Sequence, residues 1–461
     1  MYRNNTLILL FLIILISCQE REWENPYDLD TPIEIWAPLN LNIEVQSESE
    51  IKLTWETTSP VIDGFIVERK TNNDVFYEIF RTAETYYIDK DIDAQSVNVY
   101  AYAYRIKAYA DKQISDISNV KKYQYKATDF TLRWTGQHDA SVRSVAFSPD
   151  NRKVASGDNY GIIKLWDAAT GLVTWTLDYF SCTVHTISFS PDNKKVVYVN
   201  GADIDVRDAA TGELLWYSDH ESGIGSVSFS TDNNMVVSGD EDFVNVWDAQ
   251  TGDLIWTADD MSISSVRFSP NSSYVVYGTS NNVKLHDALT GTLLWQEPHN
   301  DVNSVNFSYD NNMIVSGGGD STLRVWETTT GALIWTGFHD DEIYSVNFSQ
   351  DNSKIVSGGL DNTLKVWDAI SGEKLWTGNH NDNIYSVNFS PDNSMVISAG
   401  KDDTFKIWDT EMGSLLFTGD HVGGTTSINF SSDNSMLVTG GMDETLKVWQ
   451  FAYEWEVLDR D

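Results

Sequence analysis

Apolar and polar residues alternate in short runs along most of this chain, and polar turns separate the runs. Ile51, Leu53 and Trp55 alternate with polar neighbours, and the stretch 102–109 alternates again. Runs of this length and period predict β-strands that bury one face. We therefore expect an all-β protein that begins with an antiparallel β-sandwich over residues 36–124.

The same alternation recurs from about residue 130 with a period of about 40 residues, and each unit holds four short runs. One four-stranded sheet cannot bury both apolar faces, so neighbouring sheets must stack around an axis and close a ring. A phenylalanine marks every unit: Phe147, Phe189, Phe229, Phe268, Phe307, Phe348, Phe389 and Phe430. A Trp, or a residue in its place, ends the third run: Trp166, Arg207, Trp247, His286, Trp326, Trp367, Trp408 and Trp449.

These markers resemble those of WD-repeat proteins, which implies an eight-bladed β-propeller over residues 125–450 and a C-terminal tail at 451–461. In that family a His before the first strand, a Ser or Thr in the second, an Asp in the next turn and the Trp of the third form a hydrogen-bonded tetrad. Four consecutive repeats match it: His299, Ser316, Asp320 and Trp326; His339, Ser357, Asp361 and Trp367; His380, Ser398, Asp402 and Trp408; His421, Thr439, Asp443 and Trp449.

The other repeats depart from this pattern. The first and third keep the His, Ser and Trp, namely His138, Ser156 and Trp166, and His220, Ser238 and Trp247. Tyr160 stands at the Asp position of the first repeat, and the third has a shortened turn around Asp242. With Arg207 and His286 at the Trp position, the second and fourth repeats are expected to lack the network and to form the softer half of the ring.

A His, a Ser and an Asp in each repeat are also the residue types of a hydrolase triad. An active site is needed once, whereas a structural device is needed in every blade, so the repetition indicates a structural role. The sequence contains no zinc spacing, phosphate-binding loop or nucleophile elbow. We expect no catalytic residues, no metal and no cofactor.

The ends of the repeat region predict how the ring closes. Residues 132–138 match the outer-strand sequence 333–339, but they precede the first repeat, and the last repeat stops at Trp449 without an outer strand. Residues 130–135 are thus expected to complete the eighth blade. Residues 453–457 are an alternative for the same edge.

Candidate partner-binding residues lie four positions before each repeat phenylalanine. The residue there varies, while the next is Ser or Thr in every copy. In the resembled family this end of the inner strands faces the docking side of the ring. The series is Arg143, His185, Gly225, Ser264, Asn303, Tyr344, Tyr385 and Thr426. Arg143, His185, Tyr344 and Tyr385 are the predicted anchors for a protein partner, and neutral drift is the alternative explanation.

Two other functions fit parts of the chain. The turns 167–175 and 248–256 resemble the docking motif of eight-bladed quinoprotein dehydrogenases, yet that family's aspartate, glutamate and calcium ligands have no counterpart here, and docking between blades explains the same residues. Ala37-Pro38, Trp55 and the stretch 104–109 resemble a fibronectin type III domain, whose family often accompanies glycan-binding proteins. We interpret this domain as a spacer or docking module.

The first residues indicate export. An apolar run from Leu7 to Ile16 suits a signal peptide and is too short to cross a bilayer. It ends in Leu15-Ile16-Ser17-Cys18, which resembles the bacterial lipobox; the resemblance implies loss of residues 1–17 and an acyl anchor on Cys18, with 18–35 as an acidic tether. A plain secretory signal is the alternative. The expected location is the cell envelope, anchored to the outer membrane.

The charge of the chain excludes some classes of binding partner, and its cysteine content excludes an internal disulfide. Asp and Glu number 68 against 31 Lys and Arg, a net charge of −37 that repels nucleic acid and anionic lipid. Cys18 and Cys182 are the only cysteines, so no internal disulfide is expected after lipidation, and Cys182 is predicted to be a small buried residue. The chain is expected to be a monomer that binds other proteins.

Overall fold

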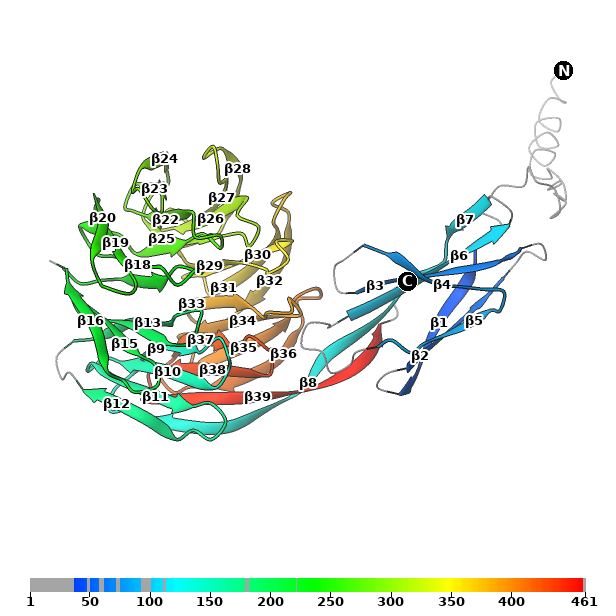
Figure 1. Cartoon of the computed structure of the whole chain (residues 1–461), viewed down its shortest axis with the longest axis horizontal. Coiled ribbons are helices and arrows are strands. Elements are labelled where there is room, and N and C mark those ends of the chain that lie inside the picture. Colours follow the sequence, from blue (N-terminus) through cyan, green and yellow to red (C-terminus); the bar gives the residue numbers. More distant parts are fainter. Residues whose placement is uncertain are drawn as a thin grey trace, which may run out of the picture. The chain divides into compact units, whose positions relative to one another are not determined.

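The computed structural model describes residues 37–47, 50–57, 62–71, 75–92, 101–110, 113–178, 182–220 and 222–458. The predicted signal peptide, Cys18 and the whole tether lie outside these residues. The chain divides into two compact units at 126/127, with residues 454–461 assigned to the first unit. The secondary structure of the described residues consists of strands (Figure 1). None of them forms a helix long and apolar enough to cross a membrane.

The first unit is a sandwich of two antiparallel sheets, as the alternation predicts. One sheet has the order β1 (Leu39–Ser47), β2 (Glu50–Glu56), β5 (Tyr86–Asp89). The other contains β8 (Lys121–Gln137), β6 (Ala101–Ala110), β3 (Gly64–Thr71) and β4 (Tyr77–Thr82), and β7 (Gln113–Ile117) pairs with β6. Trp55 and Tyr104 are buried in the core between the sheets. The Tyr104 hydroxyl donates to Asp89 at 2.9 Å, and Arg69 pairs with the same carboxylate at 2.8 Å.

The second unit contains seven consecutive four-stranded antiparallel sheets. Their strands are β9 (Val142–Phe147), β10 (Lys153–Asp158), β11 (Ile162–Asp167), β12 (Val173–Asp178); β13 (Val184–Phe189), β14 (Lys195–Asn200), β15 (Asp203–Asp208), β16 (Leu214–Asp219); β17 (Ser226–Phe229), β18 (Met235–Gly239), β19 (Phe243–Asp248), β20 (Leu254–Asp259); β21 (Ser265–Phe268), β22 (Tyr274–Gly278), β23 (Asn282–Asp287), β24 (Leu293–Pro298); β25 (Val302–Phe307), β26 (Met313–Gly318), β27 (Thr322–Glu327), β28 (Leu333–Phe338); β29 (Ile343–Phe348), β30 (Lys354–Gly359), β31 (Thr363–Asp368), β32 (Lys374–Asn379); β33 (Ile384–Phe389), β34 (Met395–Gly400), β35 (Thr404–Asp409), β36 (Leu415–Asp420).

The last repeat supplies three strands and takes its outer strand from the start of the repeat region. The order is β37 (Thr425–Phe430), β38 (Met436–Gly441), β39 (Thr445–Leu458), β8. The His138 amide donates to the Glu444 carbonyl at 2.8 Å, which sets the register of this closure. The alternative outer strand, residues 453–457, instead continues β39 to Leu458, so a separate tail from 451 is wrong.

The first strand of each sheet packs against the first strands of its neighbours, from β9 through β37 and back to β9, so these strands are the innermost ones. Figure 1 shows the sheets of this unit around a common centre. Apolar residues of adjacent sheets form the cores, such as Val315 and Val325 against Val346 and Phe348. A closed ring of radially packed four-stranded sheets is a β-propeller.

Six outer strands carry a tryptophan whose indole donates a hydrogen bond to the next sheet. The Trp295 indole of β24 donates to the Thr328 carbonyl at 2.8 Å and lies so close to Gly331 that a Cβ there would meet the ring at 2.9 Å. Gly331 also has a φ of +72°, which disfavours any other residue. The same contact closes the ring, because Trp134 of β8 donates to the Ala168 carbonyl at 2.9 Å. The Thr-Gly turns thus serve docking between sheets.

The Ser or Thr that follows each variable inner-strand residue has a structural task that the sequence did not reveal. Six of these serine hydroxyls accept the amide of the neighbouring inner strand; Ser304 accepts from Val346 at 3.2 Å, and Ser427 accepts from Val145 at 3.2 Å across the closure. The others are Ser144, Ser226, Ser265 and Ser345. These bonds explain why the position stays constant while its neighbour varies.

Candidate functional site

The predicted tetrads form continuous buried hydrogen-bond lines. In the sheet β29–β32, the Trp367 indole donates to Ser357 Oγ at 2.8 Å, Ser357 lies 2.7 Å from His339 Nε2, and His339 Nδ1 lies 2.9 Å from Asp361. The sets ending in Trp408 and Trp449 have the same connections. In the set ending in Trp326 the imidazole is reversed: His299 Nδ1 lies 2.8 Å from Ser316, and Nε2 lies 3.3 Å from Asp320. All four Ser or Thr residues are fully buried.

The pKa values of the tetrad histidines indicate neutral imidazoles, each of which lies between a hydroxyl group and a carboxylate. Burial lowers the pKa of His299 to about 4, and it also lowers the pKa of His339. Burial opposes ionisation of Asp402, but hydrogen bonds from the Asn381 amide and Thr404 outweigh it and lower its pKa to about 2. In the sets of His339, His380 and His421 the Asp accepts from Nδ1. The Ser or Thr hydroxyl is held between the imidazole and the indole. These hydroxyls do not face solvent, so they are not placed to attack a substrate.

The first and third repeats carry complete tetrads, although the sequence pattern predicted no matching Asp in the first and a shortened turn around Asp242 in the third. Asp158, not the residue at 160, contacts His138 Nδ1 at 3.0 Å. Asp240, not Asp242, contacts His220 Nδ1 at 2.6 Å. Both aspartates follow a Ser-Gly pair directly, two residues after the tetrad serine, and they also cap their turns by accepting backbone amides.

The second repeat has a substitute network, so the expected loss of hydrogen bonding is wrong. Tyr198 replaces the tetrad serine, and its hydroxyl donates to Asp205 at 2.6 Å. The Arg207 guanidinium takes the place of the indole: Nε donates to the Tyr198 oxygen at 2.6 Å, and Nη2 lies 3.0 Å from Asp205. A buried charge is therefore paired, as its desolvation requires.

The fourth repeat also has a substitute network, in which a carboxylate stands at the usual His position and an imidazole at the usual Trp position. Asp260 occupies the usual His position, Tyr277 the Ser position and His286 the Trp position. The Tyr277 hydroxyl donates to Asp260 at 2.9 Å and lies 3.0 Å from His286 Nε2. Lys284 pairs with Asp260 at 2.6 Å. The two substitutions from Ser to Tyr were the signal that a replacement network existed.

The predicted anchors lie at the beginnings of inner strands, and ring closure brings them onto one arc. Tyr344 (β29) and Tyr385 (β33) are half-buried neighbours, with ring centroids 6.1 Å apart. Arg143 (β9) and His185 (β13) are neighbours on the surface, and Arg143 donates to the Asn159 side chain. Desolvation by the surrounding protein, together with the Arg143 charge, lowers the pKa of His185. Thr426 of β37 lies between the two pairs and donates to the Val142 carbonyl.

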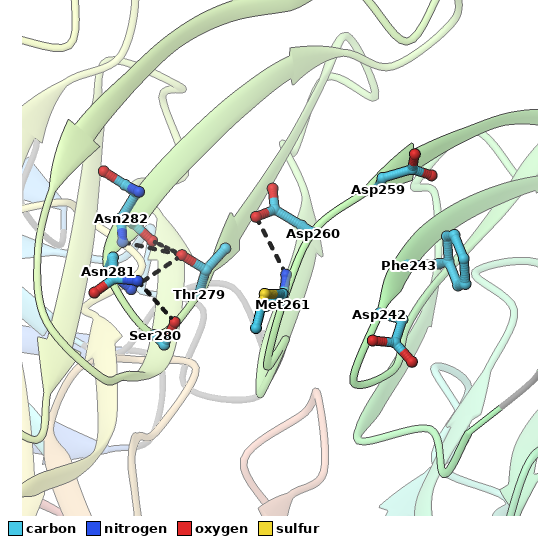
Figure 2. Close-up of a pocket in the computed structure, with 9 residues that line it drawn as sticks. All are labelled: Asp242, Phe243, Asp259, Asp260, Met261, Thr279, Ser280, Asn281 and Asn282. Carbon is cyan, nitrogen blue, oxygen red and sulfur yellow. Dashed lines mark hydrogen bonds between the residues drawn. The ribbon is translucent and has the colours of Figure 1, made fainter.

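The same end of the sheets holds a pocket on the other side of the ring, of about 560 Å³. It lies between the third and fourth sheets of this unit and is lined by Asp242, Phe243, Asp259, Asp260, Met261, Thr279, Ser280, Asn281 and Asn282. Figure 2 shows the side chains of three turns around it, with the Thr279 hydroxyl accepting the amides of Asn281 and Asn282 at 3.2 and 3.0 Å. Its exposed carboxylates favour cationic groups.

The structure also describes Cys182 and the side chains that could bind a metal. Cys182 is exposed and free, so its prediction as a buried residue is wrong. Among the described residues, no group of three or more His, Cys, Asp or Glu side chains is arranged to hold a metal ion.

Comparisons with known proteins agree with this class of fold. The family described as WD domain, G-beta repeat matches residues 130–167, 291–327, 332–368, 372–409 and 413–450. The family described as outer membrane protein assembly factor BamB matches residues 200–276, which span the divergent repeats. The crystal structure of the computationally designed protein Ika8 is 31% identical, with a TM-score of 0.61, over 68% of this chain and 97% of Ika8. No curated protein matches significantly. The matches and the fold together support a β-propeller that contains WD repeats.

Proposed function

We propose that this chain is a non-catalytic scaffold of the bacterial cell envelope, anchored by acyl chains on Cys18, which binds another protein through the arc Tyr344, Tyr385, Thr426, Arg143 and His185. The chain acts as a monomer with an eight-bladed propeller and a fibronectin type III-like sandwich.

The observation that carries the proposal is the placement of two aromatic, one guanidinium and one imidazole side chain on five consecutive inner strands. Tyr and Arg are enriched among residues that dominate binding energy at protein interfaces. The remaining inner strands have Gly225, Ser264 and Asn303 at the equivalent position, so large side chains are confined to one arc. WD repeats generally mediate protein–protein interaction, and the partial match to a family named as an assembly factor favours the same role.

The test is affinity capture from native envelope with residues 19–461, compared with the variant Arg143→Ala, His185→Ala, Tyr344→Ala, Tyr385→Ala. A control variant, Arg152→Ala with Tyr217→Ala, removes exposed residues of the same types elsewhere. We expect one protein to be retained by the parent and the control and lost by the quadruple variant. Equal retention by all three proteins contradicts the assigned surface.

A quinoprotein-like dehydrogenase is the second candidate, favoured by the Thr-Gly turns that contact tryptophans and by the match at 200–276. It is tested by adding pyrroloquinoline quinone and measuring binding and dye reduction. Binding with turnover, together with failed capture, replaces the scaffold proposal. Retention on a glycan array instead supports the third candidate, a glycan-binding surface protein.

A further inference from the structure

The inner strands form a ring around the axis of the propeller. Propellers have a central channel along this axis, and the preceding proposal does not use it. On each inner strand the residue directly before the repeat phenylalanine is partly exposed, while both flanking residues are buried. The second strand covers the outer side and neighbouring inner strands cover the flanks, so this exposure faces the axis. The eight residues are Ala146, Ser188, Ser228, Arg267, Asn306, Asn347, Asn388 and Asn429.

The residues that face the channel include no carboxylate, although the molecule as a whole is strongly acidic. The chain has 68 Asp and Glu residues, but none occupies these eight positions or the eight variable positions at the strand beginnings. Arg267 is the cation in the first set. In its own sheet the aspartate three residues after the repeat phenylalanine is also replaced, by Asn271. A carboxylate is thus missing where every other sheet carries one.

The Arg267 guanidinium has no carboxylate within ion-pair distance among the described residues. Its Nη1 donates to Ser226 Oγ at 3.3 Å and to the Val266 carbonyl at 3.2 Å, whereas Nε and Nη2 make no hydrogen bond with the described chain. The side chain is exposed to solvent, and yet the surrounding protein desolvates it and lowers its pKa. Both properties agree with a position inside the channel.

Neighbouring groups provide further hydrogen-bonding capacity. Ser228, at the equivalent position of the preceding sheet, has a hydroxyl that is buried without a partner. Asn306, in the following sheet, donates its amide to Asn347. Tyr309, two residues after the repeat phenylalanine of that sheet, is solvent-exposed, but crowding by the protein raises its pKa. A desolvated guanidinium with free donors requires a counter-ion, and its planar fork matches a carboxylate.

We propose that the channel binds a carboxylate at Arg267, held through Nε and Nη2. This site is independent of the arc Tyr344 to His185. The carboxylate comes either from a small free acid or from an acidic side chain of a partner segment that enters the channel.

The experiment uses the purified chain and two probes: sodium acetate against equal sodium chloride, and a capped peptide Ala-Ala-Asp-Ala-Ala against its Asn analogue. Binding is measured by calorimetry and by the shift in Tm. The variants are Arg267→Gln, Arg267→Lys and the control Arg152→Gln, which removes an exposed arginine of a turn. We expect the carboxylate to raise Tm by about 1–3 °C in the parent and the control, with at least tenfold weaker binding in Arg267→Lys and none in Arg267→Gln.

Binding of acetate identifies a free acid as sufficient, and binding of the Asp peptide alone identifies a partner's side chain. Near-UV circular dichroism establishes that each variant is folded. Should Arg267→Gln fail to fold, Arg267→Lys decides. Equal affinities in the parent and the Arg267 variants, or no response to either probe, overturn the proposal.

Discussion

At the scale of single residues, the fourth repeat shows that a tetrad can be rebuilt with other chemistry. Tyr277 is larger than the Ser at this position elsewhere, and its ring already packs against His286 with centroids 5.3 Å apart. His286→Trp alone should therefore overfill the core and cost about 1–3 kcal/mol. Adding Tyr277→Ser and Asp260→His recreates the common tetrad and should recover most of this loss. Urea denaturation of the single and triple variants measures both effects. If the triple variant is no more stable than the single one, the three positions do not act as a unit.

Ionisable side chains of the tetrads also contribute to the dependence of stability on acid pH. Burial lowers the pKa of His299 from 6.5 to about 4, so the unfolded chain takes up a proton there first. The contribution of His299 to the free energy of unfolding is therefore complete above pH 6.5 and falls as the pH drops towards 4. At pH 4 the loss from this residue is about 3 kcal/mol. The lowered pKa values of Asp402 and Asp443 add a further loss below about pH 4.

Thermal melts between pH 8 and 4 measure this slope. The variant His299→Gln has no titrating group at that position, so its Tm should decline less between pH 6.5 and 4 than that of the parent. Parallel profiles for the two proteins contradict the assignment of acid sensitivity to the buried imidazole.

At the scale of elements, the turn between the third and outer strands is where one sheet receives the next. Gly331→Ala introduces a Cβ about 2.9 Å from the Trp295 ring, at a φ of +72°. We expect a destabilisation of about 1–3 kcal/mol, because both the backbone and the indole must shift. Gly223→Ala is the control, since a Cβ there meets nothing within 4 Å. Equal midpoints of denaturation for the two variants exclude a docking role for the turn.

Periodicity predicted these elements because strand alternation and turn chemistry are local properties. Tetrads with the common spacing, such as His339 to Trp367, were predicted for the same reason. Asp158 and Asp240 were missed because they reach the imidazole from a different turn position, and spacing alone does not convey that geometry. The charge in the channel was missed because Arg267 differs from its counterparts only when all inner strands are placed around one axis.

At the scale of the whole molecule, the sheet that closes the ring is completed without a short loop, because β8 pairs with β39 from the other end of the repeat region. Sheets elsewhere in the ring are held together by short loops, so loss of one docking Trp leaves them at high effective concentration. Closure instead depends on the pairing of β8 with β39 and on the packing of β9 against β37, which no short loop joins. Trp134 of β8 docks on Ala168 in the core between the last sheet and the first. Trp134→Ala and Trp335→Ala delete the same side chain at equivalent positions, and each should cost about 3–5 kcal/mol.

The two variants should differ in how the ring opens. Trp134→Ala is expected to release β37–β39 and β9–β12 together, since both flank the closure, and their amides should exchange hydrogen faster than those of the other sheets. Trp335→Ala should raise exchange only near β28 and β31, where the chain still joins the sheets. Hydrogen exchange read by mass spectrometry separates these patterns. Local exchange of the same extent in both variants would mean that the hydrogen bonds of Ser427 and His138 hold the closure without the indole.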